Sequence, residues 1–283
     1  MSALVPTDLD EALRAIGAHP DALVLAGGTD AMVEINAGHR RPRTIIALNR
    51  VAELRSWTHD PADRTVRIGA GVTYTELMEQ PLCELIPALA EASRTVGSPQ
   101  IRNAGTLGGN LGTCSPAGDG LPVLAALDAL VHLASAAGER SIPFRQFMLG
   151  VKRTARQPDE LITAVTLPVL AGWQGYSKVG VRNAMVIALA SACLATDAPT
   201  SSVRLALGSV GPTIIRCDTA EAFARESVDF TTRSASPATV ARFGELAAAA
   251  SRPIDDHRAT AEYRRHAIGV LASRLLRRAF PND

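Results

Sequence analysis

Aromatic residues, excess charge and long apolar runs are all scarce in this sequence of 283 residues. Aromatics make up only 4% of it, which argues against a base-stacking surface for single-stranded nucleic acid. The formal net charge is +1, so no overall field attracts polyanions or acidic membranes. No uncharged apolar run is long enough to cross a bilayer. We therefore expect no nucleic-acid partner and no membrane insertion.

Clustered cysteines are also lacking. The four cysteines are Cys83, Cys114, Cys193 and Cys217, and no two have the CxxC or ferredoxin-type spacing of a zinc or iron–sulfur site. Scattered thiols suit a reducing cytoplasm, and the acidic N-terminal segment does not resemble a signal peptide. We expect a cytoplasmic chain without a bound metal, in which Cys114 is a small, partly buried thiol.

Motifs for common kinds of catalysis are missing as well. None of the six histidines lies in an HExxH motif or beside a nucleophile, and no GxSxG is present. No GxGxxG follows a predicted strand, so the usual Rossmann route to a dinucleotide is absent. The sequence therefore predicts no catalytic residue of its own.

Helical and strand patterns mix without a regular βαβ rhythm, which predicts an α+β fold. Helices are expected from a Thr7–Asp10 capping box, from Pro87, from Pro237 after Ser236, and from Thr260. Strands are expected at residues 22–25, 44–48, 66–70, 161–167, 175–181, 186–196 and 203–210. Residues 97–120 are polar and glycine-rich and are predicted to form one long functional loop. Proline and glycines in residues 168–175 indicate a boundary between domains of residues 1–170 and 171–283.

Two glycine-rich turns are candidates for binding phosphate groups. Paired glycines let the backbone approach a ligand, and successive N–H groups in such turns form a concave anion site. A single Gly–Gly pair is more often only a tight turn, and that alternative applies to both. The first turn is Ala26, Gly27, Gly28, Thr29 and Asp30, and the second is Thr106, Leu107, Gly108, Gly109 and Asn110.

Asp119 follows the second turn and precedes an expected helix. It is either an acid that favours a helix N-terminus or an acceptor for a ribose hydroxyl.

Six segments, in this order, resemble the FAD-binding medium subunits of the xanthine dehydrogenase and carbon monoxide dehydrogenase group. The resemblance is interrupted at residues 110–114 and 182–185, where many relatives carry other residues. The matching segments are residues 25–35, 68–77, 98–129, 158–168, 176–188 and 263–276.

The resemblance implies a PCMH-type FAD-binding fold of two α/β subdomains, followed by a smaller C-terminal α+β domain. It assigns the FAD pyrophosphate to the two turns, the ribose to Asp119, and the isoalloxazine to Leu161, Ile162 and Lys178. The complete set of expected FAD contacts is Leu25, Ala26, Gly27, Gly28, Thr29, Asp30, Ala31, Gly97, Ala104, Thr106, Gly108, Gly109, Asn110, Asp119, Leu161, Ile162 and Lys178.

The resemblance also implies a function within a hetero-oligomeric molybdenum hydroxylase. A large subunit with a molybdenum cofactor hydroxylates the substrate, and a small subunit with two [2Fe–2S] clusters passes electrons to FAD, which delivers them to NAD, oxygen or another acceptor. Two alternatives remain at this point, an FAD-free scaffold subunit and a self-sufficient flavin oxidoreductase.

Two roles of basic residues are left open by the sequence. Lys178 is expected either to tune the potential of the flavin ring or to be a solvated lysine at a strand end. The arginines of the last helix, near residues 264–278, are expected to form a solvated face.

Overall fold

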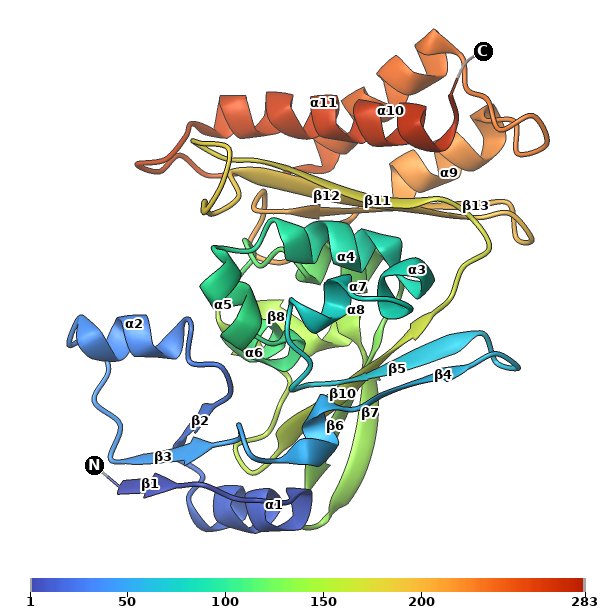
Figure 1. Ribbon diagram of the computed structural model, residues 1–283. Coiled ribbons are helices and arrows are strands. Elements are labelled where there is room, and N and C mark those ends of the chain that lie inside the picture. The colour runs from blue at the N-terminus through green and yellow to red at the C-terminus, as the bar shows by residue number, and fades with distance from the viewer. Residues whose placement is uncertain (1, 282–283) are drawn as a thin grey trace.

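The first sheet of the chain is parallel and lies at the bottom of Figure 1. The structure is a computed structural model that describes residues 2–281. β1 (Ser2–Leu4), β3 (Thr44–Ala47) and β2 (Leu23–Leu25) follow one another in this sheet. α1 (Leu9–Ala18) connects β1 to β2, and α2 (Ala31–Asn36) connects β2 to β3. Apolar residues of α1 and β3 share a small core, whereas α2 buries none of its residues.

The capping box of α1 lies one residue later than predicted. Asp8 Oδ1 accepts the N–H of Glu11 at 2.7 Å, and Glu11 Oε2 accepts the N–H of Thr7 at 2.8 Å. The predicted pairing of Thr7 with Asp10 is therefore wrong, although the helix itself begins where expected.

The second sheet is antiparallel and carries most of the short helices. Its order is β4 (Trp57–Asp60), β5 (Thr65–Gly69), β10 (Leu161–Pro168), β6 (Leu130–Ser135) and β7 (Gly138–Pro143). A hairpin of β8 (Met148–Gly150) and β9 (Arg153–Thr154) follows β7. The helices of this part are η1 (Ala52–Arg55), η2 (Glu76–Met78), α3 (Leu82–Leu85), α4 (Pro87–Arg94), α5 (Pro99–Ala104), α6 (Leu107–Thr113), α7 (Leu121–Ala126) and α8 (Phe144–Phe147).

The third sheet lies between two layers of helices (Figure 1). β11 (Gln174–Val179), β12 (Ala190–Asp197), β13 (Ser202–Gly208) and β14 (Ile215–Arg216) are antiparallel neighbours. One face packs on α9 (Asp218–Ser227) and α11 (Ala261–Ala279), which α10 (Pro237–Ala250) contacts in turn, and the other face packs on α4 and α7. Every residue of β12 is buried, with Cys193 in the core shared with α4 and α7 and Leu194 in the core under the C-terminal helices. Burial on both faces explains the apolar sequence of this strand.

The predicted long loop at residues 97–120 is wrong, because it contains two helices. Ser98 caps α5 by accepting the N–H of Ile101, and Thr106 caps α6 by accepting the N–H of Gly109. The glycines of α6 have low intrinsic helix propensity, so the composition of the segment does not predict a helix. Capping and tertiary contacts stabilise the helix instead.

The longer C-terminal helices begin at the residues that the sequence predicts. Ser236 caps α10 and Thr260 caps α11, in each case through the side-chain oxygen, and Pro87 is the first residue of α4. The predicted strand at residues 186–196, in contrast, begins only at Ala190, because residues 180–189 form the loop between β11 and β12.

The expectation of a solvated arginine face on α11 is wrong for Arg264, and the half-exposed Arg278 also makes contacts within the fold. Arg264 is only 4% exposed, and it donates to the carbonyl of Leu189 at 2.8 Å and to Asp256 at 2.7 Å. Arg278 pairs with Glu91 of α4 at 2.8 Å and lies over the ring of Trp173 at 5.0 Å. These arginines connect α11 to other parts of the fold.

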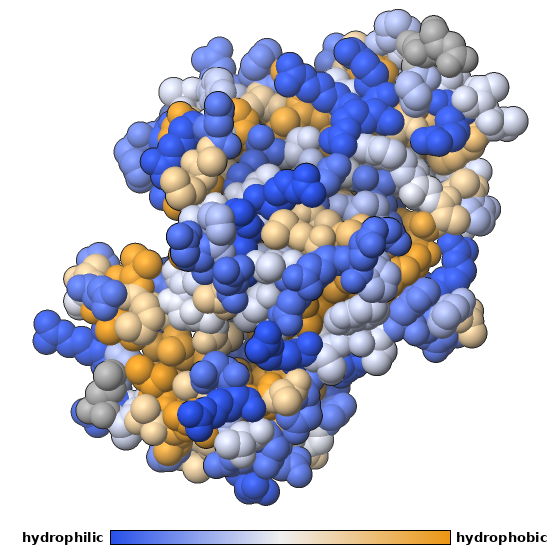
Figure 2. Space-filling model, viewed as in Figure 1, coloured by the Kyte–Doolittle hydropathy of each residue, from blue (hydrophilic) through white to orange (hydrophobic). Residues whose placement is uncertain are grey.

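Hydrophobic residues are exposed mainly in the lower part of the face drawn in Figure 2, where the N-terminal sheet lies, and hydrophilic residues cover most of the upper part. None of the helices within residues 2–281 is long and apolar enough to span a membrane. In the same part of the chain, no group of three histidine, cysteine or acidic side chains is arranged to hold a metal ion.

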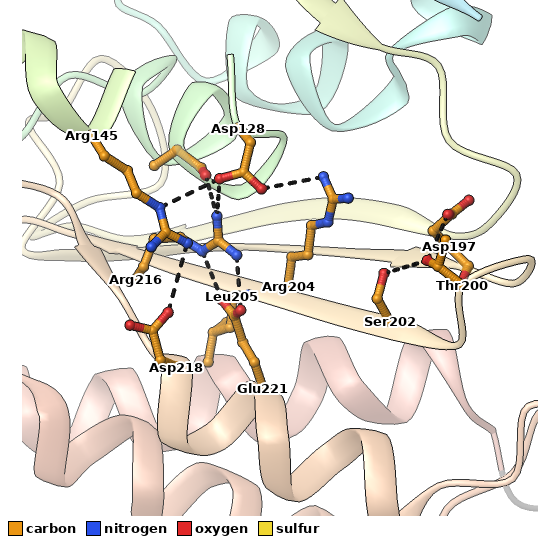
Figure 3. Close-up of polar contacts among 11 residues, drawn as sticks. Asp128, Arg145, Asp197, Thr200, Ser202, Arg204, Leu205, Arg216, Asp218 and Glu221 are labelled. Atoms are coloured by element: carbon orange, nitrogen blue, oxygen red, sulfur yellow. Dashed lines mark hydrogen bonds and ion pairs between the residues drawn. The ribbon is translucent and has the colours of Figure 1, made fainter. Parts of the chain in front are cut away.

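An arginine cluster around Asp128 joins the second and third sheets (Figure 3). Asp128 lies between α7 and β6 and accepts a hydrogen bond from Arg216 of β14 at 2.6 Å. Arg145 and Arg204 approach the same carboxylate at 3.4 and 3.5 Å. The side chain of Arg216 is 8% exposed and also binds both carboxylate oxygens of Glu221. Three arginines share this one carboxylate. Asp128 therefore neutralises positive charge that the fold brings together from two sheets.

We expect Asp128→Asn to lower the free energy of unfolding by about 1–2 kcal/mol, on the scale of one hydrogen bond to a charged group. Asparagine tolerates the left-handed backbone at this position, where φ is 49°, so the loss reports the carboxylate charge. Urea unfolding monitored by circular dichroism measures it. The matched control is Glu245→Gln in the exposed Arg242–Glu245 pair, which should cost less than about 0.5 kcal/mol. Equal effects of the two substitutions would contradict a bridging role for Asp128.

Candidate functional site

The first glycine-rich turn leads from the end of β2 into α2. Leu25 is the last residue of β2 and Ala31 is the first of α2, so residues 26–30 are neither strand nor helix. Gly28 has a φ of +71°, a conformation that residues with a Cβ rarely adopt. Within residues 2–281, no acceptor lies in hydrogen-bonding range of the backbone N–H groups of residues 26–30. The turn therefore offers a run of free N–H donors, which is the arrangement that binds phosphate oxygens.

The first turn is packed directly against the end of α5, just before the second glycine-rich turn. A Cβ placed on Gly27 would overlap the carbonyl oxygen of Ala104, the last residue of α5. At the far end of α6, the hydroxyl of Thr113 donates to Asp30 at 3.2 Å. The two glycine-rich segments, about 80 residues apart in the sequence, thus lie together in the fold.

The second turn is the start of α6, and the backbone donors of its residues 107–110 are already used. The N–H groups of Leu107 and Gly108 donate to the carbonyls of Val72 and Ala70, at 3.1 and 2.8 Å. The N–H groups of Gly109 and Asn110 donate to the side chain and the carbonyl of Thr106. The expectation that both turns supply free N–H groups is therefore wrong for residues 107–110 of the second turn. What this turn offers a ligand is the hydroxyl of Thr106 and the side chain of Asn110.

Asn110 carries a buried polar atom without a partner. Its Oδ1 makes no hydrogen bond to any of residues 2–281, although an unpaired buried amide oxygen is costly. The amide is packed closely by Gly118 and Gly120, where an added Cβ would stand 3.0 Å or less from it. A side chain held this tightly with unused bonding capacity fits a binding role.

Asp119 lies at the centre of a buried polar group. Tyr176 donates its hydroxyl to Oδ1 at 2.8 Å, and Lys178 donates to Oδ2 at 2.7 Å. Both members of the ion pair are about nine-tenths buried, so the interpretation of Lys178 as a solvated lysine is wrong. Burial raises the pKa of Asp119, and the Lys178 ammonium opposes that shift. The helix-acid interpretation is incomplete, because Asp119 is paired with side chains from β11.

The other expected FAD contacts include two buried apolar side chains and a tight turn at Gly97. The side chains of Leu161 and Ile162 are buried in two different cores, one on each side of the start of β10. Gly97 has a φ of +42°, and a Cβ there would stand 2.8 Å from Ile101. Arg102 donates to the carbonyls of Val96 and Gly97 and so fixes this turn.

Several residues around the site were not found from the sequence. Thr113, Arg102 and Tyr176 each hold an expected site residue in place through a side-chain hydrogen bond. The sequence neighbourhoods of Thr113 and Tyr176 carry no signal of this, because their partners lie 83 and 57 residues away, whereas Arg102 reaches a carbonyl 5 residues away.

Cys114 is an unreactive structural residue in this arrangement. It ends α6 with a left-handed backbone, φ 49°, and is fully buried. Burial raises the pKa of its thiol to about 11, so the thiolate needed for redox chemistry is scarce near neutral pH.

Comparison with known proteins identifies the family of the chain. Residues 1–170 match the family described as the FAD binding domain in molybdopterin dehydrogenase. Residues 176–279 match the CO dehydrogenase flavoprotein C-terminal domain. The chain belongs to the FAD-binding medium subunits of the molybdenum hydroxylases.

Individual relatives of this family span nearly the whole chain. The xanthine dehydrogenase FAD-binding subunit of Escherichia coli O157:H7 is 30% identical over 278 residues, which cover 96% of this chain and 93% of the relative. The carbon monoxide dehydrogenase medium chain of Hydrogenophaga pseudoflava is 28% identical over 288 residues, covering 97% and 95%.

Solved structures of carbon monoxide dehydrogenase have the same fold. The enzyme from Hydrogenophaga pseudoflava gives a TM-score of 0.89 at 28% identity, covering 99% of this chain and 96% of that one. The enzyme from Oligotropha carboxidovorans gives 0.90 at 26% identity, covering 100% and 98%. The expected fold, an FAD-binding domain followed by a C-terminal flavoprotein domain, is confirmed, as is FAD as the cofactor.

We expect Gly27→Ala to weaken FAD binding about tenfold or more, equivalent to about 1.4 kcal/mol. The new Cβ would push the first turn away from Ala104. Titration of the apoprotein with FAD, followed by fluorescence quenching, measures the loss. Gly112→Ala is the control, since its Cβ would meet nothing nearer than Ile162 Cδ1 at 4.0 Å and alanine favours a helix. Wild-type affinity in Gly27→Ala would contradict the contact of the two turns.

We expect a thiol reagent at pH 8 to modify only Cys83 rapidly in the native protein. Cys83 is partly exposed, whereas the other three cysteines are buried. Burial raises the pKa of Cys114 to about 11 and that of Cys217 to about 12. The unfolded protein should show all four thiols, and Cys83→Ser should abolish the rapid phase. Rapid labelling that survives in Cys83→Ser would show that a buried thiol is reactive.

Proposed function

We propose that the chain is the electron-transfer subunit of a molybdenum hydroxylase complex. In this proposal it accepts electrons from the [2Fe–2S] clusters of a small partner subunit and passes them through FAD to NAD, oxygen or another acceptor. A large partner subunit with the molybdenum cofactor oxidises the substrate. The assembly is a cytoplasmic hetero-oligomer.

The observation that carries the proposal is the run of free N–H donors at residues 26–30 beside Thr106 and Asn110. A pure scaffold has no use for such a site, because unsatisfied donors and a positive-φ glycine bring no stability. When bound, FAD supplies the ability to take up electrons singly and release them in pairs. The chain itself contributes binding and orientation.

In the proposed site, the N–H groups of residues 26–30 hold one part of the pyrophosphate, and Thr106 and Asn110 hold the rest. Asp119 retains lone pairs beyond those used by Tyr176 and Lys178, so it can accept a ribose hydroxyl. Leu161 and Ile162, whose side chains are buried, line the ring mainly through their main chain. The remaining contacts proposed are Leu25, Ala31, Gly97, Ala104, Gly108 and Gly109.

We propose residues 1–170 as the FAD-binding domain and residues 171–283 as the C-terminal domain. The sheet of β11–β14 belongs to the C-terminal domain and packs on α4 and α7 of the FAD-binding domain. Tyr176 and Lys178 of β11 reach Asp119 across this contact. In this proposal the C-terminal domain therefore completes the FAD site.

The absorbance spectrum of the purified chain tests the proposal, with the released cofactor identified by mass. We expect about one FAD per chain, and anaerobic mixing with a reduced [2Fe–2S] partner should bleach the flavin. Absence of flavin both in the chain and in its co-purified assembly would leave the scaffold alternative. Turnover of a small substrate by the FAD-loaded chain alone would favour a self-sufficient oxidoreductase.

A further inference from the structure

The end of β13 is a sharp turn that packs on the segment of residues 115–122. β13 ends at Gly208, and the next residue, Ser209, has a φ of 62°. A residue with a Cβ rarely adopts this left-handed conformation, so surrounding contacts must hold it in place. The N–H of Ser209 donates to the carbonyl of Pro116 at 2.8 Å. A Cβ on Gly208 would stand 2.8 Å from Pro122 Cγ and 3.3 Å from the carbonyl oxygen of Pro116, so the two segments are in close contact.

The segment of residues 115–122 also shapes the proposed FAD site. Asp119 belongs to it, and Gly118 and Gly120 pack on the amide of Asn110. The N–H of Gly118 donates to the carbonyl of Ser115 at 2.9 Å, so this part of the segment is a tight turn. A shift at the end of β13 would therefore displace Asp119 and the packing of Asn110 together.

Arg264 of α11 binds the other side of Ser209. Arg264 is 4% exposed, and its Nη1 donates to the carbonyls of Ser209 at 3.3 Å and Leu189 at 2.8 Å. Its Nη2 donates to Asp256 at 2.7 Å. A buried guanidinium is costly unless acceptors surround it, so this arginine and the carbonyl of Ser209 hold each other in place. Ser209 is thus bonded through its N–H to Pro116 and through its carbonyl to Arg264.

The hydroxyl of Ser209 takes no part in this arrangement. Its Oγ is buried and makes no hydrogen bond to any of residues 2–281. What Ser209 contributes is therefore its backbone. A glycine at this position would adopt the same φ without the steric cost of a Cβ. Ser209→Gly therefore keeps the backbone contacts and lessens the need for outside contacts to hold the turn.

We propose that Arg264 is a positioning residue of the FAD site. By holding the carbonyl of Ser209, it keeps the turn after β13 in the conformation whose N–H binds Pro116, and so fixes the segment that carries Asp119. Helix α11 thereby acts on residues 115–122 through the sheet of β11–β14. The part of the proposal that concerns FAD rests on the proposed function, whereas the fixing of the segment does not.

Arg264→Met tests this role, because methionine keeps part of the apolar side chain and removes the donors. Amide hydrogen exchange of the apoprotein, measured residue by residue by NMR, reports directly on the turn. We expect the N–H groups of Ser209 and Gly118 to exchange about tenfold faster or more, on the scale of one hydrogen bond from a charged group. The charge-matched control is Arg274→Met, which removes an exposed arginine of the same helix and should leave both rates unchanged.

Ser209→Gly separates this role from a general loss of stability. Arg264 also binds Leu189 and Asp256, and the loss of those bonds has the same effect with serine or glycine at position 209. If Arg264 holds a strained turn, Arg264→Met should accelerate exchange at Gly118 several-fold less in the Ser209→Gly chain than in the wild-type chain. Equal acceleration in both chains would overturn the proposal, and so would wild-type exchange in Arg264→Met.

Titration of the apoprotein with FAD gives a second readout. We expect Arg264→Met to weaken FAD binding about tenfold, and Arg264→Met combined with Ser209→Gly to bind FAD more tightly than Arg264→Met alone. A merely structural role of Arg264 predicts no such rescue, because the hydroxyl that is removed makes no bond in the described part of the chain. Unchanged affinity in a chain whose exchange has accelerated would overturn the role of Arg264 at the FAD site.

If Arg264→Met does not fold, Arg264→Lys keeps the charge beside Asp256 and loses the planar fork that reaches the two carbonyls. Faster exchange at Ser209 is again expected, and wild-type exchange again overturns the proposal. A wild-type chain and assembly without FAD would end the proposed function, but the exchange experiment on the apoprotein would still decide whether Arg264 fixes residues 115–122.

Discussion

The backbone of Gly27 lies against the carbonyl of Ala104 so closely that no side chain fits between them. This contact joins the parallel sheet, which carries the first turn, to the helices above the antiparallel sheet. Asp30 and Thr113 add a hydrogen bond at the other end of the same junction. Because the first turn is held from outside, its N–H groups need not bond to one another or to the sheet. The free donors of the site are thus a consequence of how two subdomains meet.

The C-terminal sheet also positions side chains of the site. Since β12 is buried on both faces, the sheet belongs to the core under α4 and α7 as much as to the core under α9–α11. Tyr176 and Lys178 therefore leave a well-packed strand to reach Asp119. A buried ion pair adds little net stability compared with apolar packing. Its benefit here lies in fixing the position of a carboxylate.

Local signals made part of this structure predictable. Ser236 and Thr260 begin helices because their side chains satisfy N–H groups within three residues, and the positive φ of Gly28 follows from a glycine pair. Helix α6 was missed because what stabilises its first turn is the distant carbonyls of Val72 and Ala70. The three partners of Lys178 lie 8, 59 and 83 residues away, and no sequence period reports contacts of that kind.

Few positively charged side chains are available at the site to bind a phosphate. The first turn contains no lysine or arginine, and the sequence has only two lysines. One of them is paired with Glu34 and the other with Asp119, so neither is a free cation for a phosphate. Fixed N–H dipoles bind an anion without the loss of side-chain entropy that a long cationic side chain entails. They hold it only where the backbone is already in place, so binding in this fold depends on the packing of Gly27 more than on any charged residue.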